Sequence, residues 1–65
     1  MIRQIRGEVL SVGPISAVIE VAGFGVEVRM SSPQALSVHS EATLATHLVL
    51  KQDGLELYGF PNVAD

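Results

Sequence analysis

The sequence predicts an all-β fold built from five short strands, and three features of the chain support this prediction. Apolar and polar residues alternate along several runs, which is the spacing that places every second side chain on one face of a strand. Many of the apolar residues are valines, whose branched side chains favour strands over helices. Short segments that contain glycine or proline separate the runs, as is typical of turns.

The first three predicted strands follow one another closely. The first begins near Ile2 and ends before Gly13-Pro14, because proline has no backbone N–H to donate. The turn at Ala22-Gly23 has the spacing of a hairpin and joins the second strand to the third. The expected ranges are 2–12, 15–21 and 24–30. The side chains expected on the apolar faces of the second and third strands are Ile15, Ala17, Ile19, Val21, Val26, Val28 and Met30.

A helix is expected next, followed by two more strands. Ser32 is a suitable N-cap and Pro33 fits the first helical position, so one or two helical turns are predicted from Pro33 to about Val38. The fourth strand is expected over 42–50, with Leu44, Thr46, Leu48 and Leu50 on one side. A polar turn that contains Asp53-Gly54 then leads into the fifth strand, over 55–60.

Five short strands with a helix between the third and the fourth are the element order of an OB-fold barrel. Closing the sheet into a barrel removes the exposed edges that an open sheet would present. An SH3-like barrel is the alternative, but it does not require a helix at this place. We expect one OB-fold domain over residues 1–61, with residues 62–65 as the start of a linker to a further element.

Composition narrows the possible functions. The chain has no cysteine, which excludes disulfides and thiolate metal sites. Its net charge of −3, without a basic run, argues against a chain that grips nucleic acid by itself. A hydrophobic fraction of 48% is high for so small a domain and indicates that part of the surface faces a partner. No membrane span or signal peptide is visible, so a cytoplasmic location is predicted.

The sequence offers little for catalysis, and no cofactor is expected. His39 and His47 lack the further ligands that a zinc site needs, and are interpreted as a loop histidine and a strand histidine. The Gly23–Gly25 segment lacks the third glycine of a dinucleotide fingerprint and the lysine of a P-loop, so a tight turn is the better interpretation. We therefore predict that the chain is not an enzyme.

A generic nucleic-acid-binding barrel is the alternative function. OB-folds bind single strands with aromatic stacking platforms inside a basic groove. Tyr58 and Phe60 share one strand face and fit such a platform, but few lysines and arginines surround them. Packing at the end of the barrel or at an interface is therefore the favoured interpretation of these two rings. Single-strand or protein binding through this face stays open as the alternative.

Three ordered segments resemble a known family. The segment THLVLKQDGLELYGF, residues 46–60, resembles the end of the first domain of RuvA, the Holliday-junction-binding subunit of the bacterial branch-migration machine. The opening MIRQIRGEV, residues 1–9, is similar to that family's start, and residues 19–28 resemble its second and third strands. The Leu-Tyr-Gly-Phe ending at residues 57–60 is the most specific part.

The resemblance implies an architecture and partners. RuvA-like proteins have an OB-fold domain that helps to build a homotetramer, a helix-hairpin-helix domain that grips DNA, and a third domain that engages the RuvB ATPase motor. This chain would supply the first domain of such a protein. The implied partners are a four-way DNA junction, other RuvA-like subunits, a RuvB-like motor and, through the full complex, a RuvC-like resolvase. ATP hydrolysis would belong to the motor, and no membrane is involved.

The resemblance also implies a site, an acidic pin in the turn before the last strand. Its carboxylates lie near the centre of the junction, where they repel phosphates and help to separate strands. Asp53 matches the pin, whereas Gln52 departs from the acid that is usual at its position. Lys51 flanks the turn and is a candidate contact to the DNA backbone. Glu56, four residues after Gln52, is a candidate substitute for the missing acid.

Overall fold

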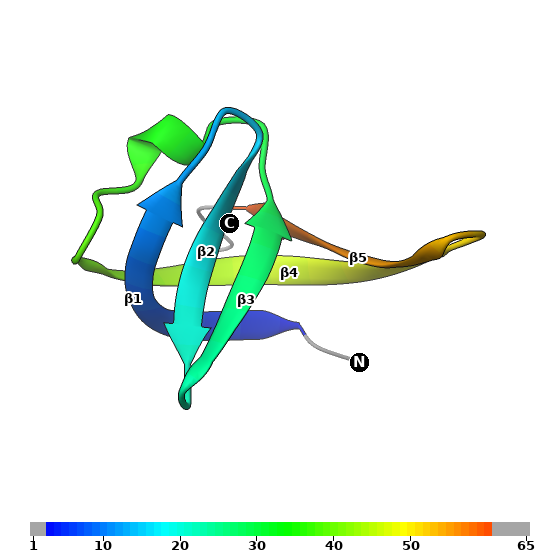
Figure 1. Cartoon of the computed structure of the whole chain (residues 1–65), viewed down its shortest axis with the longest axis horizontal. Coiled ribbons are helices and arrows are strands. Elements are labelled where there is room, and N and C mark those ends of the chain that lie inside the picture. The colour runs from blue at the N-terminus through cyan, green and yellow to red at the C-terminus, as the bar shows by residue number, and fades with distance from the viewer. Residues whose placement is uncertain (1–2, 61–65) are drawn as a thin grey trace.

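The computed structural model describes residues 3–60, which form a five-stranded sheet closed into a barrel (Figure 1). The elements in chain order are β1 (Gln4–Val12), β2 (Ser16–Val21), β3 (Phe24–Arg29), η1 (Pro33–Ala35), β4 (Glu41–Lys51) and β5 (Gly54–Phe60). All five predicted strands are confirmed, with ends that differ from the expected ones by a residue or so. The expected start near Ile2 and the linker at 62–65 lie outside the described residues.

The strand order around the barrel is β1-β2-β3-β5-β4, which confirms the OB-type barrel. Strand β1 is long and curved, and pairs with β4 through its first half and with β2 through its second half. An irregularity in register between Val9 and Ser11 helps it to bend. The barrel closes where β3 meets β5 in parallel, with Arg29 opposite Tyr58.

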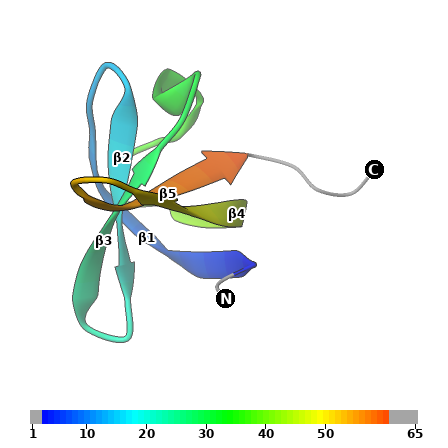
Figure 2. The ribbon, with the colours of Figure 1, turned by 90° about the vertical axis from the view of Figure 1, so that its right-hand side faces the viewer.

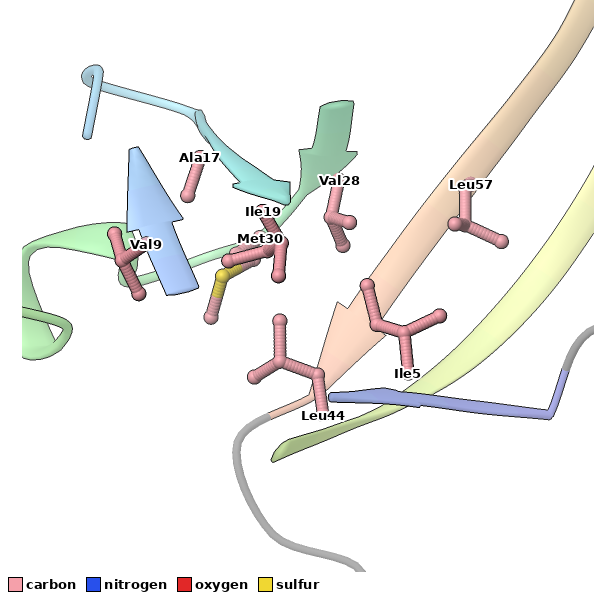
Figure 3. Packing of buried hydrophobic residues seen from close by; sticks show 8 residues of the cluster. All are labelled: Ile5, Val9, Ala17, Ile19, Val28, Met30, Leu44 and Leu57. Atoms are coloured by element: carbon pink, nitrogen blue, oxygen red, sulfur yellow. The ribbon is translucent and has the colours of Figure 1, made fainter. Parts of the chain in front are cut away.

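The core lies between the strands and contains residues from all five of them (Figure 3). Its buried hydrophobic members are Ile5, Val9, Ala17, Ile19, Val28, Met30, Leu44 and Leu57. Alternation therefore predicted the core correctly through the middle of the strands. At two strand ends the predicted apolar side is not covered, since Ile15 is 53% exposed and Leu50 is 80% exposed. Both residues have the expected apolar character, but the barrel does not extend far enough to cover them.

The predicted helix is shorter than expected. The structure has a 3₁₀ turn over Pro33–Ala35, Ser32 makes no side-chain capping hydrogen bond, and Leu36 already has extended backbone angles. The reason lies in the segment that follows. His39 donates its N–H to the Val9 carbonyl, and Val9 donates its N–H to the Ser40 carbonyl. These bonds hold the chain against β1, so the backbone leaves the helical path soon after Pro33.

The β2–β3 turn is the two-residue hairpin that the sequence predicts. Val21 pairs with Phe24, and the two residues between them, Ala22 and Gly23, have φ angles of 53° and 88°. Positive φ at both central positions matches the right-handed twist of the flanking strands. The Gly23–Gly25 segment is thus part of this turn and of the start of β3.

The β4–β5 hairpin as the candidate functional site

The hairpin of β4 and β5 extends beyond the rest of the barrel. Figure 1 shows its far end well outside the sheet of β1, β2 and β3, and in Figure 2 the same end points toward the viewer. The two strands pair from Ala45 and Phe60 to Lys51 and Gly54. Gly54 has a φ of 140°, a backbone angle that residues other than glycine rarely adopt. The sequence therefore fixes the turn at this point of the hairpin.

Gln52 and Asp53 form the two-residue turn at the tip, and both are exposed. The tip thus presents one carboxylate and one amide at the point of the hairpin farthest from the core. The structure brings these two predicted site residues together with Lys51, which is the last residue of β4.

Glu56 lies on β5 and faces a different set of groups. Its Oε1 atom lies 2.6 Å from Nζ of Lys51, and its Oε2 atom contacts Nε of Arg29 on β3. The Tyr58 hydroxyl donates to Oε1 over 3.3 Å, and the Lys51 ammonium lies 5.6 Å from the centre of the Tyr58 ring. We call these four residues, Arg29, Lys51, Glu56 and Tyr58, the Glu56 cluster.

The cluster shifts the pKa of two of its members. The hydrogen bond from Lys51 lowers the pKa of the Glu56 carboxyl, and the nearby Arg29 charge acts in the same direction. In turn, the bonds to Glu56 and Tyr58 raise the pKa of Lys51. Both groups are therefore charged near neutral pH, and each has an opposite charge beside it. The cluster is an ion-pair network at the surface, on the side of the hairpin that faces away from the core.

The opposite face of the hairpin is apolar. Leu57 is buried in the core and Leu48 packs against it, directly across the strand pair. The next pair on the same face lies two positions closer to the tip and consists of Leu50 and Leu55. Leu50 is 80% exposed and Leu55 is 65% exposed. The apolar stripe therefore continues past the end of the barrel toward the turn.

The Leu-Tyr-Gly-Phe segment combines several roles on β5. Leu57 is a core residue, and Tyr58 belongs to the Glu56 cluster. Gly59 is buried so closely against the Val28 side chain that a Cβ atom there would collide with it. Phe60 is 53% exposed and lines a cleft with Ile15 and Met30. Tyr58 is partly buried and engaged in contacts, so it offers little open ring surface as a stacking platform.

The Glu56 cluster is the feature that sequence reasoning missed. Arg29 and Glu56 are far apart in the chain, and no motif links them. One signal was available: the OB strand order places β3 beside β5, and Arg29 and Glu56 fall on the polar positions of their strands. Within residues 3–60, the acidic and histidine side chains form no group of three suited to a metal ion. His39 contacts Glu8, with 3.2 Å between Nδ1 and Oε2.

The fold and the hairpin together define a class of protein, a small OB-type barrel with a projecting polar turn. A sequence model described as the RuvA N terminal domain matches residues 1–59. The chain therefore belongs to the RuvA N-terminal domain family, as the resemblance predicted.

Curated relatives carry the same family name. A protein of Bifidobacterium adolescentis named "Holliday junction branch migration complex subunit RuvA" is 46% identical over 66 residues, which cover 98% of this chain and 32% of that protein. Proteins with the same name from Streptomyces griseus and Salinispora arenicola are 46% and 47% identical, covering 95% and 92% of this chain and 31% of each relative. The chain thus spans about a third of the length of these relatives.

The structure also bears on membranes in one respect. Among residues 3–60, no helix is long and apolar enough to cross a bilayer.

Proposed function

We propose that this chain is the barrel module of a subunit that binds four-way DNA junctions in a branch-migration complex. The observation that carries the proposal is the family match over residues 1–59, supported by relatives that are named as such subunits. The module contributes to a homotetramer and presents its hairpin tip to the junction. A RuvB-like motor and a RuvC-like resolvase join through the complete complex, in the cytoplasm. The module itself is non-catalytic, and ATP hydrolysis belongs to the motor.

The charges of the barrel support a role at the centre of the junction, away from the DNA arms. Of the four basic residues in the chain, Arg6, Arg29 and Lys51 each lie beside a glutamate. A basic side chain that is already paired with a carboxylate displaces few counterions from DNA, so it contributes little to the affinity of the protein for DNA. Gripping the DNA backbone is therefore assigned to other parts of the subunit.

Asp53 is proposed as the acidic group that acts at the junction. Its carboxylate is exposed at the end of the projecting hairpin, where it can approach DNA phosphates and repel them. Gln52 provides an amide where the family usually has a second acid, so each copy has one carboxylate in its turn. Glu56 is not proposed as the replacement, because Lys51 and Arg29 already neutralise its charge.

A domain exchange tests this function. Residues 1–60 of this chain replace the matching segment of the Bifidobacterium adolescentis relative, and the unaltered relative is the control. We expect the exchanged protein to bind a synthetic four-way junction more tightly than a linear duplex with the same arm sequences, in a gel-shift assay. If the exchanged protein folds and assembles normally but binds junction and duplex equally, the proposed function is wrong.

A further inference from the structure

The two carboxylate oxygens of Glu56 form ion pairs with residues of two different strands. One oxygen contacts Arg29 of β3, and the other contacts Lys51 at the end of β4. The side chain of Glu56 is only 21% exposed, while those of Arg29 and Lys51 are 45% and 41% exposed. The ion pair with Arg29 links β5 to β3, two strands that the backbone joins through a single register pair.

We propose that Glu56 is a positioning residue for the hairpin tip, one that ties the hairpin to β3 and holds the Lys51 ammonium away from the turn. This inference rests on the proposed function, because it concerns how the Gln52–Asp53 turn is presented to DNA. It assigns Glu56 a role other than that of a second pin carboxylate.

Glu56 attaches the hairpin mechanically to β3. Within the described residues, the backbone register between β3 and β5 consists of one pair, Arg29 and Tyr58. Glu56 lies two residues nearer the tip than Tyr58, so its ion pair with Arg29 extends the attachment of the hairpin beyond the last backbone pair. A cavity lined by Glu27, Arg29 and Glu56 marks the place where β5 diverges from β3. The ion pair therefore bridges the two strands where their backbones separate.

Glu56 also has an electrostatic effect, which acts through Lys51. Lys51 is adjacent in sequence to the turn, and its long side chain is able to reach toward either the tip or the barrel. Glu56 and the Tyr58 ring hold the ammonium on the barrel side, with 2.6 Å between Nζ and Oε1. Among residues 3–60, no lysine or arginine forms an ion pair with the Asp53 carboxylate. Loss of Glu56 would release Lys51 to contact a DNA phosphate near the tip.

The mechanical part is tested on the chain itself, without DNA. The chain has no cysteine, so Gln52→Cys and Ser11→Cys accept two spin labels, one at the tip and one on β1. We expect one narrow distribution of label distances, which Glu56→Gln and Arg29→Gln both broaden. The matched control is Glu41→Gln, which removes the exposed ion pair with Arg6 and is expected to leave the distribution unchanged. Circular dichroism checks that each variant folds. An unchanged distribution in folded Glu56→Gln overturns the inference.

The electrostatic part is tested in the domain-exchanged protein. If Glu56→Gln releases Lys51 to a phosphate, the slope of log affinity against log salt should steepen by about 0.9 for each new contact. Arg29→Gln leaves the Lys51–Glu56 pair in place and should not steepen the slope. Equal slopes for all three proteins would overturn the electrostatic part. If the exchanged protein did not distinguish junction from duplex, the proposed function would be refuted. The spin-label measurement uses no DNA, so its outcome does not depend on that function.

Discussion

At the scale of single residues, Gly59 shows why one position of the Leu-Tyr-Gly-Phe segment has no side chain. A Cβ atom at Gly59 would collide with Cγ1 of Val28 and also contact Leu44 and Met30. We expect Gly59→Ala to lower the free energy of unfolding by about 1–3 kcal/mol, the usual cost of overfilling a packed core. Urea unfolding measures this change. Gly25→Ala is the control, since a Cβ atom there meets Val18 only at 3.4 Å. An equal loss in both variants would contradict this packing.

Glu56 should give stability a dependence on pH. Its folded-state pKa is lowered, chiefly by the hydrogen bond from Lys51, so its contribution is complete above the unfolded pKa near 4.5 and is lost as the pH falls through the folded value. We expect Glu56→Gln to be less stable than the parent chain near neutral pH and to match it in strong acid. Urea unfolding across this range tests the prediction. A difference that persists in strong acid would show that the ion pairs are not its cause.

Individual site residues differ in how well the sequence predicts them. The place of Asp53 in a turn was predictable, because a glycine follows it in a polar segment between two strands. The partners of Glu56 were not, because Arg29 reaches it only through the closure of β3 onto β5. Contacts of this kind depend on the three-dimensional path of the chain, and alternation along one strand carries no record of them.

At the scale of elements, the β4–β5 hairpin divides into a part that packs and a part that projects. Leu57 and Leu55 lie on the same face of β5, but Leu57 is 8% exposed and Leu55 is 65% exposed. We expect Leu57→Ala to lower the free energy of unfolding by about 2–5 kcal/mol, the range for truncating a buried leucine. Leu55→Ala should change it by less than about 0.5 kcal/mol. Comparable losses would mean that the outer part of the hairpin packs onto the barrel.

Elements were predictable where local pattern decides them and less so where tertiary contacts do. Strand alternation is local and predicts β2 to β5 well, whereas β1 departs from it at the irregularity between Val9 and Ser11. The helix expected up to Val38 ends at Ala35, because the backbone at His39 and Ser40 bonds to Val9 of β1. The exposure of Leu50 likewise depends on where the barrel ends, which the alternation of β4 does not reveal.

At the scale of the whole molecule, the barrel alone should bind nucleic acid poorly. The chain has a net charge of −3, and Tyr58 is engaged in the Glu56 cluster. We expect no binding of single-stranded oligonucleotides to the 65-residue chain at micromolar concentration and physiological salt, measured by fluorescence anisotropy. Salt-dependent micromolar binding, reduced by Phe60→Ala, would favour the generic OB-fold function instead.

The function of the hairpin tip is best tested by changing its charge. The domain-exchanged protein is combined with the other subunits of the relative's branch-migration complex. The rate of branch migration is then compared between the domain-exchanged protein with Asp53 and its Asp53→Asn variant. Glu20→Gln is the control, because it removes one exposed carboxylate from β2 without altering the turn. A role for the Asp53 charge at the junction predicts that Asp53→Asn alters the branch-migration rate while assembly and junction binding remain intact, and that Glu20→Gln has no effect. Equal rates for all three proteins would contradict it.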